Sequence, residues 1–287
     1  MITVMGATGH IGHRVVRLLR EQGHDVRGVG RSANRIAATG ADPCAGDAAD
    51  AAFLTDAFRG ADAVFTMLPD DAAEPDHRAA QDAKGEAIAA AVRASGVGYV
   101  VALSAVGADR PAGTGFIEAL HAQEQRLRAT GVPLLVLRPT WFQDNAAAAL
   151  PVVAEHGVVA DALAPDIAVP MVATRDVAAA AASALAARDR TGIVELLGPR
   201  DLTPVEMAAI LGARLGRPDL PYVRLPADEM IGALTGAGFS ADAAGLHVAM
   251  CEAINDGRVA PMAGRTPENT TPTRFEDLVG ELVGQVV

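Results

Sequence analysis

The chain has 287 residues, of which 50% are hydrophobic and 21% are charged, and its formal net charge is −11. This composition is that of a folded globular protein and excludes a disordered chain. The acidic balance, without any basic block, argues against nucleic acid as a partner, because phosphate backbones are bound by clustered Lys and Arg.

The chain contains two cysteines, Cys44 and Cys251, which are too few for a disulfide framework. Their spacing matches no metal-ligand motif, so we expect no metal site, and a reducing, cytoplasmic compartment. The first residues contain no positively charged segment followed by an apolar one, and we expect no signal peptide. Apolar runs such as residues 177–187 are too short to span a bilayer, so no membrane contact is expected.

The first predicted elements are a strand over residues 2–5 and a following helix, joined by the turn GATGHIG at residues 6–12. Unpaired N–H groups and the dipole at a helix start favour an anion such as a phosphate. Gly6 permits a sharp turn, Gly9 leaves room for a pyrophosphate, and Gly12 lets the helix approach the strand. An ordinary glycine-rich turn is the alternative, but the strand before the motif and the helix after it indicate a dinucleotide site.

Strands and helices alternate through the first half of the chain. Near-continuous apolar strands separated by amphipathic helices predict a parallel sheet covered on both faces, an α/β doubly wound fold of the Rossmann type. In such a fold the ligand lies at the carboxyl ends of the strands. The expected strands cover residues 2–5, 25–30, 42–45, 63–68, 99–103 and 133–137, and the expected helices cover residues 13–22, 51–59, 77–94 and 115–129.

The pattern is less regular in the second half. Thr174 and Thr203 are predicted helix N-caps, the latter within a capping box and followed by a proline at the first helical position. The other expected elements are a helix over residues 142–155, short strands over residues 167–171 and 193–197, and two or three helices up to residues 275–283.

The regular first half and the irregular second half of the chain are predicted to have different roles. We predict a dinucleotide-binding core over residues 1–140. Residues 141–287 are expected to complete this core and to form a small, mostly helical cap that binds the substrate.

The end of the second strand decides which dinucleotide is expected. Folds that prefer NAD place an acidic residue there, where it accepts a hydrogen bond from the ribose 2′-OH. This strand ends in Gly30-Arg31, and Arg31 occupies the place of a 2′-phosphate. A guanidinium–phosphate contact is charge-assisted and often bidentate, so the sequence predicts NADP(H) in preference to NAD(H). The alternative for Arg31 is a solvated surface arginine.

Two further segments are expected beside the dinucleotide. Asp47 follows the third predicted strand, where it can accept from the adenine amino group or serve as a helix N-cap. Met67, Leu68 and Pro69 end the fourth predicted strand, where we expect apolar packing against the ribose and nicotinamide.

Several segments together resemble a known family. The glycine motif, with its 3,3 spacing, is similar to that of extended and atypical short-chain dehydrogenase/reductases. Residues 103–105 (LSA), 121–124 (HAQE) and 137–145 (LRPTWFQDN) narrow the resemblance to the NmrA-like group, which includes NADPH:quinone reductases and triphenylmethane reductases. The tail segments at residues 265–267 and 273–277 are also similar, so the resemblance covers essentially the whole chain.

The resemblance implies a Rossmann core with NADP(H) at the strand ends and the substrate between core and cap. The residues at matching cofactor positions are Gly6, Thr8, Gly9, His10, Ile11, Gly12, Arg31 and Asp47. Ser104 matches a position beside the nicotinamide, and the segment that begins at Pro139 would border the nicotinamide and the substrate pocket. His10, inside the glycine turn, would face phosphate or substrate.

The Tyr-x-x-x-Lys pair of ordinary short-chain reductases is absent. The only tyrosines are Tyr99 and Tyr222, the residues four positions later are Leu103 and Pro226, and the single lysine is Lys84. Carbonyl reduction with the usual tyrosine acid is therefore not expected. A quinone or another conjugated acceptor suits these residues better, because its negative charge delocalises and a weak donor completes protonation.

Five residues are candidates for contact with such a substrate, and each has a structural alternative. Ser104 can hydrogen-bond a substrate oxygen or cap its strand end. His121 can donate a proton, since imidazole titrates near neutral pH, or can simply face solvent on its helix. Trp141 and Phe142 can form an aromatic wall for a planar acceptor or pack in the core. Asn145 can contact substrate or fix the loop backbone.

The residues favour an NADPH-dependent oxidoreductase that transfers hydride to a quinone or other conjugated small molecule, with catalysis mainly by positioning. The alternative is a non-catalytic NADP(H)-binding sensor or regulator of the NmrA type. A weaker alternative is a tailoring enzyme in which NADPH supports an unusual coupling or isomerisation. The expected partner is a small molecule, and the expected state is a monomer or a homodimer.

Overall fold

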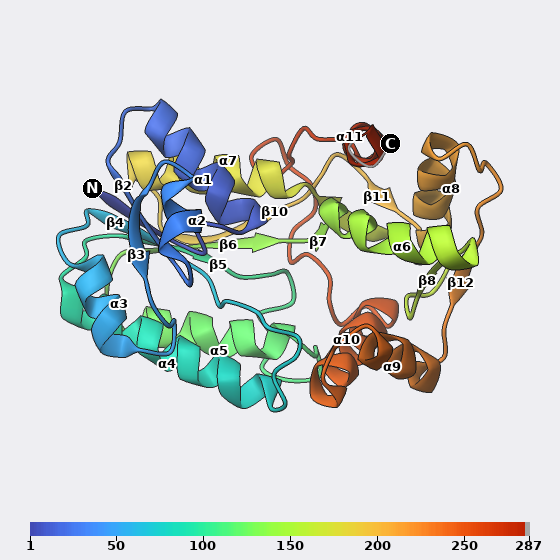
Figure 1. The fold of residues 1–287 in the computed structure, drawn as a ribbon, viewed down its shortest axis with the longest axis horizontal. Helices are drawn as coiled ribbons and strands as arrows, with labels where there is room; N and C mark the ends of the chain where they lie inside the picture. The colour runs from blue at the N-terminus through green and yellow to red at the C-terminus, as the bar shows by residue number, and fades with distance from the viewer. Residues whose placement is uncertain (285–287) are drawn as a thin grey trace.

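A computed structural model describes residues 1–284 of the chain. Seven parallel strands form the central sheet in the order β10-β6-β5-β4-β1-β2-β3 (Figure 1). The strand order reverses between β1 and β4, which places a crevice at their carboxyl ends. The predicted doubly wound fold is therefore confirmed. The strands are β1 (Ile2–Met5), β2 (Val26–Gly30), β3 (Asp42–Ala45), β4 (Ala63–Thr66), β5 (Val100–Leu103), β6 (Leu134–Pro139) and β10 (Gly192–Leu196).

Helices cover both faces of the sheet because its strands are apolar on both sides (Figure 1). Successive residues of β1 show this, since Val4 packs against one helical layer and Met5 against the other. The first layer contains α1 (His10–Glu21), α2 (Ala33–Ala37) and α7 (Thr174–Ala187). The second layer contains α3 (Ala51–Phe58), α4 (His77–Ser95) and α5 (Ile117–Arg128).

A second apolar core lies in the cap and excludes the strands of the large sheet. Its elements form a three-stranded sheet in the order β11-β9-β7, a two-stranded sheet of β12 and β8, and surrounding helices (Figure 1). They are β7 (Trp141–Phe142), a 3-10 turn (Gln143–Asn145), α6 (Ala146–His156), β8 (Val159–Asp161), β9 (Val169–Val172), β11 (Asp201–Leu202), α8 (Pro204–Arg214), β12 (Tyr222–Arg224), α9 (Ala227–Gly236), α10 (Ala241–Asn255) and α11 (Phe275–Gly284).

The chain after residue 140 contributes to both cores, because α7 and β10 return to the large sheet before α8 begins in the cap. The division into two units at residue 140 stays a prediction. None of the helices within residues 1–284 combines enough length with enough apolar character to cross a bilayer.

Two helix starts test the predicted caps. The capping box at Thr203 is confirmed, with Glu206 returning the hydrogen bond to the Thr203 N–H at 2.8 Å. The prediction for Thr174 was wrong, because Ala173 is the N-cap of α7. Asp144 takes over the capping role and accepts from the Thr174 N–H at 2.8 Å and from its hydroxyl at 2.5 Å. A carboxylate 30 residues away thus replaces the local cap.

Candidate active site

The glycine turn after β1 has the geometry of a close strand–helix connection. Gly6 has a φ of +63°, which favours glycine. A Cβ on Gly12 would lie 2.1 Å from the Gly6 carbonyl oxygen, so a side chain there would force the helix away. Gly9 is the N-cap of α1, and no side chain caps the helix start. Exposed N–H groups at an uncapped start, with no side chain in front of them, fit a bound pyrophosphate.

The other residues of the turn lie in different environments. His10 is exposed at the start of α1, whereas Ile11 packs into the core and can offer only its backbone to a ligand. The Thr8 hydroxyl lies 3.9 Å from the Cβ position of Gly30, at the end of β2. Thr8 therefore lies close to the end of β2, which Arg31 directly follows.

Arg31 follows β2 directly, and its side chain is 89% exposed. Its guanidinium lies 4.0 Å from the Asp71 carboxylate, a loose pair that a 2′-phosphate can displace. Asp47 is exposed after β3 and accepts only a local hydrogen bond from the Ala49 N–H. Its alternative role as the N-cap of α3 was wrong, because Asp50 is that cap.

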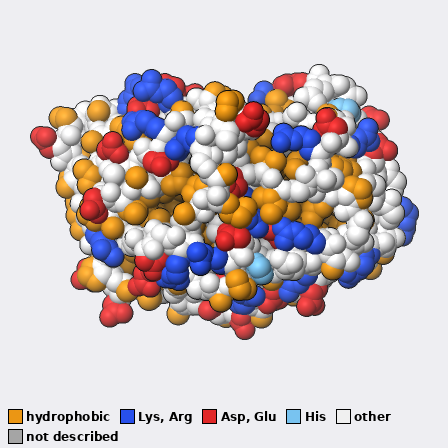
Figure 2. Space-filling model, turned by 180° about the vertical axis from the view of Figure 1, so that it is seen from behind, with side chains coloured by type: hydrophobic (Ala, Val, Ile, Leu, Met, Phe, Trp, Pro, Cys, Tyr) orange, Lys and Arg blue, Asp and Glu red, His pale blue; other side chains and the backbone are white. Residues whose placement is uncertain are grey.

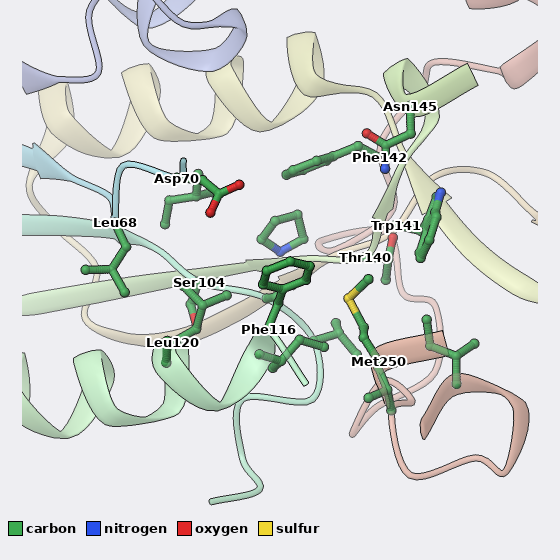
Figure 3. Close-up of a pocket in the computed structure, with 18 of the residues that line it drawn as sticks. Leu68, Asp70, Ser104, Phe116, Leu120, Thr140, Trp141, Phe142, Asn145 and Met250 are labelled. Atoms are coloured by element: carbon green, nitrogen blue, oxygen red, sulfur yellow. The ribbon is translucent and has the colours of Figure 1, made fainter. Parts of the chain in front are cut away.

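A cavity of about 360 Å³ lies between the strand ends and the cap. Figure 3 shows Phe116, Phe142 and Met250 directed into it from different elements. Figure 2 shows the molecule from behind the view of Figure 1, with hydrophobic side chains gathered around hollows in the middle of that face. Seven residues expected at the nicotinamide or the substrate line this cavity: Met67, Leu68, Ser104, Pro139, Trp141, Phe142 and Asn145.

The cavity lies next to the glycine turn, with Met67 between them. A Cβ on Gly6 would lie 3.1 Å from the Met67 sulfur, so the turn and the cavity wall are in contact. Pro69 does not line the cavity, but its carbonyl oxygen accepts from Gln81 at 3.2 Å and from Lys84 at 3.1 Å. Helix α4 thereby fixes the loop that carries Leu68. The lone lysine of the chain has a positioning role here.

The cavity wall is apolar and contains few ionisable groups. Phe116, Trp141 and Phe142 supply aromatic surface, which suits a flat conjugated molecule. The ionisable lining residues are Asp70 and His77, and no lysine or arginine lines the cavity among the residues that the structure describes.

Ser104 belongs to a buried charge network behind the cavity. Its hydroxyl donates to Glu124 at 2.6 Å, and Arg138 binds both Glu124 oxygens at 2.8 Å. Burial opposes the charge on Arg138, but the hydrogen bonds and charge of Glu124 outweigh it and raise the pKa of this guanidinium. Arg128 adds a third cationic contact to Glu124 at 2.7 Å. An ionised Glu124 can only accept, so Ser104 must give it the hydroxyl proton and can offer only lone pairs to the cavity.

His77, which sequence reasoning overlooked, lies at the cavity wall and is 3% exposed. Its Nε2 is 2.5 Å from Asp70 Oδ1, and the Phe116 ring packs edge-on against the imidazole at 4.8 Å. Asp70 is 60% exposed, so the pair connects the cavity with solvent. The sequence held only two signals of this pair. Asp70 comes just after the fourth predicted strand, and Asp76-His77 lies at the start of a predicted helix.

His121 and the tyrosines lie elsewhere. His121 Nδ1 is 2.9 Å from the Ala108 carbonyl oxygen, and His121 is not among the described residues that line the cavity. The Tyr99 hydroxyl donates to the Arg190 carbonyl, and that of Tyr222 to the Leu163 carbonyl in the cap. The structure therefore gives none of these three side chains a place on the cavity wall.

The chain resembles known proteins over most of its length. Residues 6–188 match a family model described as NAD(P)H-binding. A (4-alkanoyl-5-oxo-2,5-dihydrofuran-3-yl)methyl phosphate reductase of Streptomyces griseus is 37% identical over 76% of this chain and 75% of its own. An NAD(P)H azoreductase of Xenophilus azovorans is 31% identical over 83% of this chain and 82% of its own. The structure of an NADPH-dependent quinone oxidoreductase from Escherichia coli with NADPH has a TM-score of 0.83 at 24% identity, covering 98% of this chain and 99% of that one.

Proposed function

The chain belongs to the NAD(P)H-binding family of atypical short-chain dehydrogenase/reductases, and on this premise we propose that it is an NADPH-dependent reductase of an uncharged, flat, conjugated acceptor. The observation that carries the proposal is the apolar, aromatic cavity that touches the glycine turn at Met67. In α/β folds of this order, a ligand at the strand ends would extend from the turn into such a cavity.

The residues of the turn fit a dinucleotide. The uncapped start of α1 would hold the pyrophosphate, and Arg31 would hold a 2′-phosphate. When bound, NADPH supplies the hydride. Pro139 and Met67 would bound the reacting end on apolar surface, which excludes water from it.

Two of the relatives and the structural neighbour suggest the kind of acceptor. Their names specify an unsaturated furanone, an azo compound and a quinone, each of which has a conjugated acceptor group. The furanone reductase acts on a phosphate ester. In this chain the cavity wall offers that phosphate no lysine or arginine within the described residues, and Asp70 adds a like charge. Burying an unpaired phosphate is costly, so we infer that this chain prefers uncharged acceptors.

Protonation of the reduced acceptor requires a donor other than Ser104, whose proton is held by Glu124. We infer that His77 gives this proton from Nδ1, the ring nitrogen that Asp70 does not hold, and that Asp70 orients the imidazole through Nε2 and connects it with solvent. Ser104 would accept a hydrogen bond only from a group that carries a hydrogen, such as the amide of a bound nicotinamide or the protonated product, and so help to orient it.

The experiment compares NADPH oxidation with a neutral quinone, a neutral unsaturated furanone and its phosphate ester. We expect turnover with at least one neutral acceptor and weak or no turnover with the phosphate. Trp141→Ala should raise the KM for the acceptor and leave the affinity for NADPH unchanged, because Trp141 lies at the cap side of the cavity. Tight NADPH binding without turnover of any conjugated acceptor would contradict the proposal and favour a non-catalytic regulator.

A further inference from the structure

Three side chains with metal-binding atoms converge in the cap, behind the wall of the cavity. Asp161 ends β8, and His247 and Cys251 lie one helical turn apart on α10. The Asp161 Oδ1 atom is 3.0 Å from His247 Nε2 and 3.5 Å from Cys251 Sγ, and the latter two atoms are 3.5 Å apart. The three ligand atoms therefore form a closed triangle.

Two edges of this triangle, both 3.5 Å, match one face of a tetrahedral metal site, and the 3.0 Å edge between Asp161 and His247 is shorter. Oxygen, nitrogen and sulfur ligands at roughly 2.0–2.3 Å from zinc are roughly 3.3–3.6 Å apart when the geometry is tetrahedral. Hydrogen bonding alone explains the arrangement less well. Asp161 Oδ1 already accepts from the Ala162 N–H at 2.7 Å, and a single carboxylate oxygen has lone pairs for about two donors rather than three.

The surrounding structure holds the three ligands in place. Asp161 pairs with Arg224 of β12, and its carbonyl oxygen accepts from the Leu225 N–H at 2.9 Å just after that strand, so β12 and the residue after it fix its backbone. Cys251 is fully buried in the cap core, whereas the side chains of His247 and Asp161 are 16% and 22% exposed. The site is thus buried on the side of Cys251 and partly exposed on the side of His247 and Asp161.

We propose that Asp161, His247 and Cys251 bind a divalent transition metal ion of the zinc class, with a solvent molecule as the fourth ligand. A mixed set of carboxylate, imidazole and thiolate suits Zn²⁺ and its analogue Co²⁺, whereas Mg²⁺ and Ca²⁺ require oxygen ligands. The thiol proton passes to solvent when the thiolate binds the ion.

The ion would join α10 to β8 and thereby stabilise one wall of the cavity. Met250 and Ile254, on either side of Cys251 in α10, line the cavity. Trp141, another lining residue, packs edge-on against the His247 ring with 6.4 Å between ring centres. The metal site would therefore be structural and would act on the acceptor site only through these side chains. It does not depend on the proposed reductase activity.

The test is a titration of the metal-free full-length chain with Co²⁺, followed by absorbance. We expect one equivalent to bind and to produce a near-ultraviolet thiolate-to-cobalt band together with visible bands of tetrahedral intensity. Zn²⁺ should displace the cobalt and raise the Tm. Cys251→Ser should abolish the charge-transfer band, and His247→Gln should weaken binding by at least about 100-fold, since second-shell changes alone cost 10–100-fold.

Cys44→Ser is the matched control, because Cys44 is the other free thiol and lies half-buried on β3, the edge strand of the large sheet. It should leave the cobalt spectrum and the zinc-dependent rise in Tm unchanged. Circular dichroism of both Cys251→Ser and His247→Gln shows whether a loss of binding is a loss of folding, and His247→Gln alone suffices if Cys251→Ser does not fold. The absence of stoichiometric binding by the folded wild-type chain, or cobalt binding that survives in Cys251→Ser and His247→Gln, would overturn the proposal.

Discussion

The Ser104 hydroxyl donates its proton to Glu124, a residue that is 1% exposed, across 2.6 Å. Glu124 lies on α5 and is paired with Arg138 on β6, so the hydroxyl orientation at the end of β5 is set by two neighbouring elements. A ligand in the cavity therefore meets an oxygen acceptor at Ser104, whatever the ligand is. This arrangement separates the binding role of Ser104 from the supply of a proton.

The network predicts unequal effects of two substitutions on stability. Glu124→Gln removes the counter-charge of Arg138, which is 2% exposed, and should lower the free energy of unfolding by about 3–5 kcal/mol. Ser104→Ala removes one hydrogen bond from a carboxylate that keeps its arginine partners, and should cost about 1–2 kcal/mol. Urea denaturation measures both values. Equal losses would show that the buried ion pair does not dominate this network.

Arg31 should determine the choice of dinucleotide. Arg31→Ala should raise the Kd for NADPH by about 10–150-fold and leave the Kd for NADH unchanged. This factor corresponds to the free energy of a hydrogen-bonded contact between charged groups. The effect should decrease at high salt because the side chain is exposed. Fluorescence titration with both nucleotides measures it, and Arg59→Ala, an exposed arginine at the end of α3, is the control. Equal losses for NADPH and NADH would contradict the role of Arg31.

Asp82 should make stability depend on pH in the acid range. Burial opposes its charge, but hydrogen bonds from Arg126 and Arg78 outweigh burial and lower the pKa of this carboxyl below its usual value of 3.8. A carboxyl with a lowered folded-state pKa stabilises the fold above the unfolded-state pKa, and the contribution is lost as the pH falls through the folded-state value.

The wild-type Tm should therefore decrease more steeply below about pH 4 than the Tm of Asp82→Asn, because only the wild type loses this α4–α5 contact on protonation. Differential scanning calorimetry from pH 7 to pH 3 measures the difference. Parallel Tm curves for the two proteins would show that Asp82 does not contribute.

Much of the core could be predicted from the sequence because its signals are local. The turn at residues 6–12 and the apolar strands determine the fold by spacing alone, and the capping box at Thr203 is complete within four residues. The cap of α7 could not be predicted, since Asp144 reaches Thr174 only through the tertiary structure. The five-residue helix α2 is too short for a periodic signal.

The site was predictable where one segment forms a wall and not where distant segments meet. Trp141 and Phe142 are adjacent in the sequence and reach the cavity together. By contrast, the pairing of Ser104 with Glu124 and the meeting of Asp161 with His247 depend on contacts 20 and 86 residues apart. Cysteine spacing alone predicted no metal site, because one proposed ligand is an aspartate on a different element.

His77 provides the sharpest test of the proposed chemistry. If His77 gives the proton, His77→Gln should lower kcat by about 10²–10⁴-fold, the usual contribution of general acid catalysis, and leave the Kd for NADPH unchanged. His121→Gln is the comparison, because the His121 imidazole bonds to the Ala108 carbonyl away from the cavity, and its turnover should match that of the wild type. Stopped-flow measurement of NADPH oxidation separates the two histidines. A kcat that His77→Gln leaves near the wild-type value would show that His77 supports the wall beside Phe116 rather than supplying the proton.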